Sequence, residues 1–198
     1  MACVLVGVGF GADIKTLTQQ CEAKDGEACA DLSFEYYNAK NYSKAFEFAQ
    51  KACDLKNAVG CFNLGVSYAN EQGVEKDFFK AREFYQQACN LKNSAGCNAL
   101  GVLYAEGQGV RLDFAKAVSY FKMACDLKDN YGCNFLGWCY KDGQGVKANK
   151  NTAKEFFGKA CKLGVITTKM RYCASETALT RKVACGGWAL CLQNSAFS

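Results

Sequence analysis

A block of about 36 residues recurs along the chain, and this internal repeat constrains the fold more than any other feature. One segment of each block has the pattern Cys-x-x-Leu, which is found at Cys29–Leu32, Cys61–Leu64, Cys97–Leu100 and Cys133–Leu136. A second has the pattern Ala-x-x-aromatic-x-x-x-Ala-Cys and ends at Cys53, Cys89, Cys125 and Cys161. The second segment recurs in steps of 36 residues, and the first block is four residues shorter. Such a period indicates small units that stack on one another to bury a shared core.

Each block has the apolar spacing of two amphipathic helices. Ala81, Phe84, Ala88 and Leu91 fall at i, i+3, i+7 and i+10 of the second segment, which places them on one helical face. The aromatic residues of this face are expected in the core, at Phe48, Phe84, Tyr120 and Phe156. We therefore predict an all-α fold, an α/α solenoid. Its expected parts are a leading half-repeat helix at 13–24, repeats at 25–56, 57–92, 93–128 and 129–164, and a diverged C-terminal cap or tail at 165–198.

Helix start signals support this division of the chain. Side chains that accept hydrogen bonds at helix N-termini stand before the expected first helices, at Asn57, Asn93 and Asp129. Similar residues precede the second helices, at Asn41, Asp77, Asp113 and Asn149. Lysines recur near the ends of the second helices, where positive charge complements the helix dipole, at Lys56, Lys92 and Lys128.

The 14 cysteines include four pairs separated by eight residues. They are Cys21 and Cys29, Cys53 and Cys61, Cys89 and Cys97, and Cys125 and Cys133. The first member ends one unit and the second opens the next, so antiparallel helices joined by a short turn bring the two within disulfide reach. The alternative is buried free thiols in a cytosolic protein, which would not require four copies of one spacing. No pairing is predicted for Cys3, Cys139, Cys161, Cys173, Cys185 and Cys191.

Several function classes receive little support from composition. The chain has no histidine, which excludes a Ser-His-Asp triad, a Cys-His pair and a histidine-ligated zinc site. It also has no Cys-x-x-Cys motif, and we expect neither a metal nor a cofactor. The net charge of +5 is spread over the repeats, so nucleic-acid binding is not expected. No stretch is apolar and long enough for a stable membrane span.

Residues 1–12 are apolar, uncharged and rich in small side chains, as in the end of a secretory signal peptide. The alternative is a frayed apolar arm. Together with the cysteine content, this segment favours a secreted or periplasmic protein.

The repeat resembles the Sel1-like repeat, a relative of the tetratricopeptide repeat. The resemblance rests on Leu-Gly-x-x-Tyr, as at Leu64–Tyr68, on the Gly-x-Gly-Val loop and on the Ala-x-x-Phe-x-x-x-Ala block. The added cysteines resemble those of the Helicobacter cysteine-rich protein family. This resemblance implies secretion, a disulfide-bridged solenoid, assignment as a penicillin-binding protein or weak β-lactamase, and a role in host interaction.

No catalytic residue for a β-lactamase can be identified from the sequence. Ser119 and Lys122 form the sole Ser-x-x-Lys, and the Ser-Asp-Asn and Lys-Thr-Gly elements of serine β-lactamases are absent. The residues equivalent to Ser119 in other repeats are glutamates, so we interpret Ser119 as an exposed surface residue.

A binding groove is the better supported hypothesis. By analogy with tetratricopeptide grooves, first-helix residues should line a concave face that holds a peptide or protein partner, or a β-lactam-like small molecule. The candidates are Tyr37, Phe62, Asn98, Ala105, Tyr131, Asn134, Trp138 and Lys141. Asparagine amides suit an extended peptide backbone, aromatic rings serve as anchors, and a lysine can meet a carboxylate. One alternative is a helix face that merely tolerates water; another is a purely non-enzymatic host-interaction or structural surface protein.

Overall fold

The computed structural model describes residues 14–164, and the following statements concern that range. The signal-peptide-like segment 1–12, the tail 165–198 and four of the cysteines (Cys3, Cys173, Cys185 and Cys191) lie outside it. Within the range, the secondary structure consists of helices and contains no strand. The helices are α1 (Ile14–Glu22), α2 (Gly26–Asn38), α3 (Tyr42–Asp54), α4 (Ala58–Asn70), α5 (Phe78–Asn90), α6 (Ser94–Glu106), α7 (Phe114–Asp126), α8 (Asn130–Asp142) and α9 (Lys150–Lys162).

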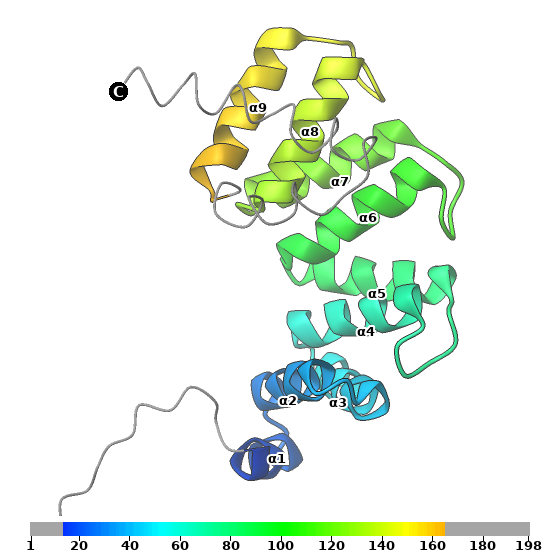
Figure 1. The fold of residues 1–198 in the computed structure, drawn as a ribbon, viewed down its shortest axis with the longest axis vertical. Helices are drawn as coiled ribbons and strands as arrows, with labels where there is room; N and C mark the ends of the chain where they lie inside the picture. The colour runs from blue at the N-terminus through cyan, green and yellow to red at the C-terminus, as the bar shows by residue number, and fades with distance from the viewer. Residues whose placement is uncertain (1–13, 165–198) are drawn as a thin grey trace, which may run out of the picture.

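Successive helix pairs stack into an elongated solenoid, with α1 at one end and α9 at the other (Figure 1). The pairs are α2 with α3, α4 with α5, α6 with α7 and α8 with α9. The first helices of successive pairs also contact one another directly, whereas the second helices contact each other less. The first helices therefore form the inner layer. The prediction of an α/α solenoid with disulfides between consecutive units is confirmed.

The expected helix start signals act as N-caps. The Oδ1 atom of Asn57 accepts hydrogen bonds from the backbone N–H groups of Val59 and Gly60, at 2.9 and 3.0 Å. Equivalent capping bonds are made by Asn41, Asp77, Asn93, Asp113, Asp129 and Asn149. Each such bond satisfies a backbone donor that the helix leaves unpaired.

The lysines that follow the second helices have a second role beside their charge. Lys56, Lys92 and Lys128 adopt left-handed backbone conformations, with φ between 62° and 67°. In each turn the lysine N–H donates to the carbonyl of the preceding cysteine, as from Lys92 to Cys89 at 2.9 Å. A left-handed conformation costs a residue with a side chain roughly 1–2 kcal/mol, so the turn is maintained by its surroundings.

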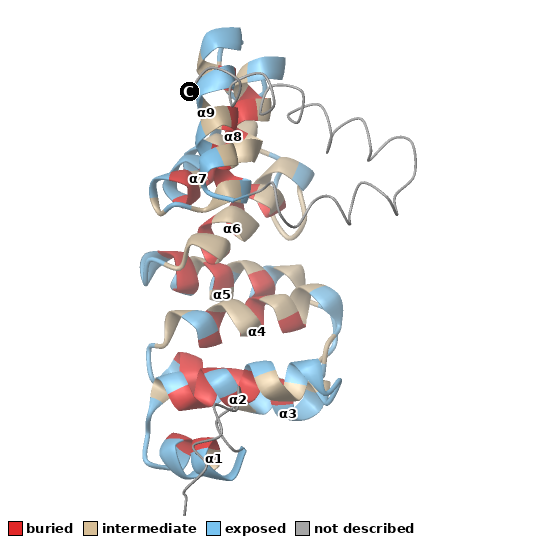
Figure 2. Cartoon of the chain, turned by 60° about the vertical axis from the view of Figure 1, so that its left-hand side comes forward, coloured by how far each residue is buried: buried red, intermediate tan, exposed pale blue. Residues whose placement is uncertain are grey.

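The core of each repeat is built from leucine, alanine and cysteine. The leucines of the Cys-x-x-Leu segments are fully buried, at Leu32, Leu64, Leu100 and Leu136. Buried stretches recur along the stack, for example on α2, α4 and α5 (Figure 2). In three repeats an aromatic ring also packs flat against a glycine of the facing helix. These pairs are Gly65 with Tyr85, Gly101 with Phe121, and Gly137 with Phe157. A β-carbon at any of these glycines would overlap the ring, so glycine is required for the close approach.

The aromatic residues expected in the core lie at its edge. Phe48, Phe84, Tyr120 and Phe156 are half-buried. Each stacks on the tyrosine of the first helix in its own repeat, with ring centroids 5.4–5.6 Å apart. The buried ring belongs to the next residue along the helix, as at Tyr85. The difference arises because adjacent positions of a helix differ by only 100°, and tertiary packing decides which of two neighbouring rings enters the core.

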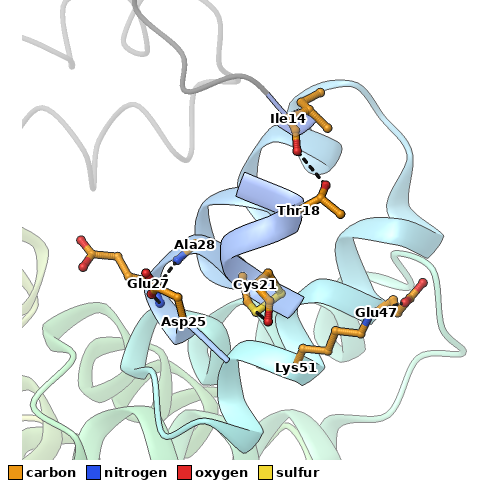
Figure 3. Close-up of a disulfide and its surroundings, with 9 residues drawn as sticks. Ile14, Thr18, Cys21, Asp25, Glu27, Ala28, Glu47 and Lys51 are labelled. Atoms are coloured by element: carbon orange, nitrogen blue, oxygen red, sulfur yellow. Dashed lines mark hydrogen bonds and ion pairs between the residues drawn. A yellow bond between two sulfur atoms is a disulfide. The ribbon is translucent and has the colours of Figure 1, made fainter. Parts of the chain in front are cut away.

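Four disulfides between described residues join the ends of α1, α3, α5 and α7 to the first turn of the next inner helix. They link Cys21 to Cys29, Cys53 to Cys61, Cys89 to Cys97 and Cys125 to Cys133, with Cα–Cα distances of 4.5–4.8 Å. Figure 3 shows the first of these corners, with Cys21 at the end of α1 beside Asp25, which caps α2. All eight cysteines are buried, so each bridge belongs to the core as well as to the turn.

Candidate functional site: the inner face

The inner helices expose one continuous face of the solenoid. We define the inner face by equivalent positions on the four helices, which the repeat spacing aligns. Its residues are Glu27, Ala30, Phe34 and Tyr37 on α2; Val59, Phe62, Val66 and Ala69 on α4; Ala95, Asn98, Val102 and Ala105 on α6; and Tyr131, Asn134, Trp138 and Lys141 on α8. These positions follow an i, i+3, i+7, i+10 pattern and so lie along one side of each helix.

Large apolar side chains on this face remain accessible to solvent. Phe34 is 57% exposed, Val59 47%, Tyr131 46% and Tyr37 40%. Exposed aromatic residues on one surface of a protein are typical of interaction sites. Tyr37 is partly positioned by its neighbours, since its ring meets Tyr42 edge-on at 5.7 Å and its hydroxyl accepts a hydrogen bond from Gln72 at 3.5 Å.

Trp138 and Lys141 form a single unit at the α8 end of the inner face. The Nζ atom of Lys141 lies 4.1 Å from the Trp138 ring centroid, which is a cation–π contact. The Trp138 ring also meets Phe157 edge-on, with ring centroids 5.5 Å apart. Trp138 is therefore half-buried and fixed, whereas Lys141 is exposed and available to an anionic group.

The two predicted asparagines are less accessible than expected. Asn98 and Asn134 are both half-buried. The Oδ1 atom of Asn98 is fully buried and has no hydrogen-bond partner. A buried acceptor without a partner costs about 1–3 kcal/mol. The Oδ1 atom of Asn98 is therefore not accessible to a ligand on the inner face.

Phe62 belongs as much to the core as to the inner face. Its ring lies 5.7 Å from that of Tyr85, and it packs against buried residues of two neighbouring repeats. Two accessible residues were absent from the sequence prediction, namely Phe34 and Val59. Phe34 aligns with Trp138, and Val59 with Tyr131, once the shorter first repeat is taken into account. Alignment of the repeats would therefore have identified both residues from the sequence.

The Ser-x-x-Lys of α7 does not form a catalytic pair. Ser119 is exposed, and its hydroxyl donates to the carbonyl of Ala115 at 3.1 Å. The ammonium of Lys122 lies 3.1 Å from a carboxylate oxygen of Asp126. Between residues 14 and 164, no group of three or more His, Cys, Asp or Glu side chains is arranged to hold a metal ion.

Cys139 is a free cysteine, and it is buried on α8. Burial, with a smaller contribution from nearby Asp142, raises the pKa of its thiol to about 11. Because the thiolate is the reactive form, Cys139 is poorly suited to nucleophilic chemistry at neutral pH.

Comparison with known proteins places the fold in a family. The Sel1 repeat model matches four consecutive stretches, residues 26–57, 58–93, 94–129 and 130–165. These stretches cover more than half of the chain, which therefore belongs to the Sel1 repeat family. Within this family it groups with the cysteine-rich proteins of Helicobacter.

Two Helicobacter pylori proteins show this relationship. The structure of cysteine-rich protein B (HcpB) is 37% identical, covers 64% of this chain and 90% of HcpB, and superposes with a TM-score of 0.53. HcpC, a β-lactamase by provisional assignment, is 46% identical over 53 residues. That match covers 27% of this chain but only 18% of HcpC, so the chain matches less than a fifth of that protein's length.

A third comparison concerns the fold alone. The protective antigen c5321 of uropathogenic Escherichia coli superposes with a TM-score of 0.75 at 23% identity. The superposition covers 93% of this chain and 41% of the antigen. No described helix is both long and apolar enough to cross a membrane.

Proposed function

We propose that the protein is a secreted or periplasmic binding module that holds a peptide or protein partner on its inner face. The observation that carries this proposal is the row of accessible aromatic and apolar residues on the inner helices, above all Phe34, Tyr37 and Tyr131. Repeat solenoids of this kind are suited to protein binding because stacked helices offer an extended, preformed surface. Four disulfides in 151 described residues favour an oxidising compartment.

The chemistry of the inner face favours an apolar segment with a negatively charged end. Phe34 and Tyr131 supply rigid rings that lose little conformational entropy on binding. Lys141, which lies over the Trp138 ring, can bind a carboxylate at the α8 end of the inner face. The amide N–H groups of Asn98 and Asn134 suit the carbonyl groups of a peptide backbone.

The first prediction tests this face. Replacing both Phe34 and Tyr131 by Ala should weaken binding at least tenfold, since exposed aromatic anchors typically contribute 1–2 kcal/mol each or more. The probe is the strongest peptide selected from a displayed random library on the oxidised protein, and its affinity is measured by isothermal titration calorimetry. Helicity should remain unchanged because both side chains are largely exposed.

A matched control comes from the outer helices. Phe79 on α5 is 66% exposed, so Phe79→Ala removes a comparable ring from another surface and should leave peptide binding intact. The companion variant Asn98→Ala with Asn134→Ala should also weaken binding. Equal peptide affinity for the parent protein and the Phe34/Tyr131 variant would disprove the assignment of the inner face.

Weak β-lactam binding or hydrolysis is the second candidate, and the similarity to HcpC favours it. The described residues supply no catalytic pair for it, because Ser119 and Lys122 are engaged by Ala115 and Asp126. Turnover of nitrocefin by purified oxidised protein is the direct assay. Full activity in a Ser119→Ala variant would exclude Ser119, and a negative assay leaves the binding module or a structural surface protein that acts without catalysis.

A further inference from the structure

A pocket of about 380 Å³ lies between α4 and α6 and has α5 as its wall. Two of its lining residues, Ala69 and Val102, belong to the inner face, so the pocket opens beside that surface. Ala99 and Leu103 add further apolar lining. The volume is near the lower limit of ligand sites and suits a short side chain or a small acid rather than a folded partner.

Tyr85 lines this pocket, and the packing of the repeat does not require its hydroxyl group. The side chain is only 6% exposed. Its hydroxyl makes no hydrogen bond to a residue between 14 and 164, and its oxygen is not among the fully buried atoms that lack a partner, so it can be reached from the solvent. The equivalent positions in the other repeats are Ala49, Phe121 and Phe157, which have no hydroxyl. A phenol kept where phenylalanine would fill the same space suggests that the oxygen has a partner which binds from outside.

The charges around the pocket indicate what that partner is. Lys76 is the sole charged residue of the lining, and its Nζ atom lies 4.8 Å from the centroid of the Phe78 ring. Lys76 makes no ion pair within the range that the structure describes. Gln108 adds an amide to the lining, and no carboxylate faces the pocket. The pocket therefore combines a cation and hydrogen-bond donors without an opposing negative charge.

We propose that the pocket between α4 and α6 binds a carboxylate group carried on a short apolar stem. The carboxylate accepts a hydrogen bond from the Tyr85 hydroxyl and lies near the Lys76 ammonium, and the stem packs on Ala69, Ala99 and Val102. Desolvation raises the pKa of the Tyr85 hydroxyl, so it remains a donor at every working pH. The carboxylate comes either from a free small acid or from a peptide held on the inner face, and the second source rests on the proposed function above.

The test uses small probes, so it does not depend on the peptide partner. Isovalerate and its neutral amide, isovaleramide, are titrated into isotope-labelled full-length oxidised protein, and backbone NMR shifts are followed. Isovalerate should shift the resonances of α4 and α6, and isovaleramide should bind at least tenfold more weakly. N-acetylleucine and N-acetylglutamate amide then present the carboxylate as a peptide terminus and as a side chain. Binding of isovalerate would identify a free acid as the ligand. Binding of the two peptide-like probes alone would identify a carboxylate carried by a peptide, and either result supports the site.

Tyr85→Phe should weaken the binding of the acid about tenfold or more, because a hydrogen bond to a charged group is lost. The variant should fold at least as stably as the parent, since Phe121 and Phe157 fill the same position in other repeats. Lys76→Met should also weaken binding of the acid. In this variant a higher salt concentration should cause no further loss of affinity. Tyr120→Phe and Lys80→Met are matched controls outside the pocket lining and should have no effect.

The pocket proposal is overturned if none of the acids shifts α4 or α6, or if Tyr85→Phe binds isovalerate as tightly as the parent does. Equal binding of the acid and its amide also contradicts it. Loss of peptide binding in the Phe34/Tyr131 variant, with acid binding intact, separates the inner face from the pocket.

Discussion

Reduction of the four disulfides that link described residues should unfold the solenoid near physiological temperature. Each bridge closes a loop of nine residues, and the chain-entropy relation gives roughly 2–3 kcal/mol for a loop of that length. The four together contribute about 10 kcal/mol, which is comparable with the whole stability of a typical domain. The far-UV circular dichroism of the reduced protein at 37 °C should therefore lose most of its helical signal.

The position of the bridges strengthens this expectation. A solenoid is stable only through contacts between neighbouring units, and the disulfides cross each boundary between consecutive described units. The matched control is oxidised protein treated with the alkylating agent alone. It should retain its helicity because Cys139, the free cysteine among residues 14–164, is buried and the pKa of its thiol is raised to about 11. A reduced protein that melts within a few degrees of the oxidised one would show that packing alone maintains the fold.

Gly101→Ala should destabilise the protein by about 2–3 kcal/mol, although alanine favours helix more than glycine does. The added β-carbon would lie 2.5 Å from the Cδ1 atom of Phe121, and both residues are buried. Neither the helix backbone nor the ring can move without disturbing the disulfide-linked corners on either side. Thermal unfolding should show a midpoint lower by roughly 5–10 °C for a chain of this size.

Gly101→Ala should instead increase the free energy of unfolding once the Phe121 ring is removed. Phe121→Ala alone leaves a cavity and should cost about 3–5 kcal/mol. Adding Gly101→Ala to that variant should raise stability by about 1 kcal/mol, because the methyl group enters the vacated space and the helix gains propensity. The double-mutant cycle should therefore give a coupling free energy of several kcal/mol.

In the first repeat, two small residues replace the glycine and the aromatic ring of this contact. Ser33 stands where the later repeats have glycine, and Ala49 stands where they have an aromatic ring; both are buried. Ser33 is further engaged by a hydrogen bond from Asn63 at 3.3 Å. Additive effects of Gly101→Ala and Phe121→Ala would contradict the account of a paired glycine–ring contact.

Much of the fold could be predicted because the repeat supplies the same information several times. The N-caps at Asn57 and Asp129, and the eight-residue spacing of cysteines such as Cys89 and Cys97, are local features that recur in register. Local features of this kind fix helix boundaries and turns with little help from tertiary structure.

The features that the sequence could not reveal depend on contacts between helices. Periodicity placed Phe84 in the core, but the ring that packs on Gly65 belongs to Tyr85, which the facing helix selects. The left-handed turn at Lys92 has no glycine to indicate it. The buried oxygen of Asn98 and the position of Tyr85 at the wall of a pocket become evident only when neighbouring repeats are stacked.

Tryptic peptide mapping without reduction tests the central claim most directly, because Lys24, Lys56, Lys92 and Lys128 each lie between the two cysteines of one pair. Trypsin therefore separates the partners, and each bridge should be recovered as two peptides joined by a disulfide. The account predicts Cys21 with Cys29, Cys53 with Cys61, Cys89 with Cys97 and Cys125 with Cys133 in native protein. Recovery of these eight cysteines as alkylated thiols, or joined in any other order, would contradict it.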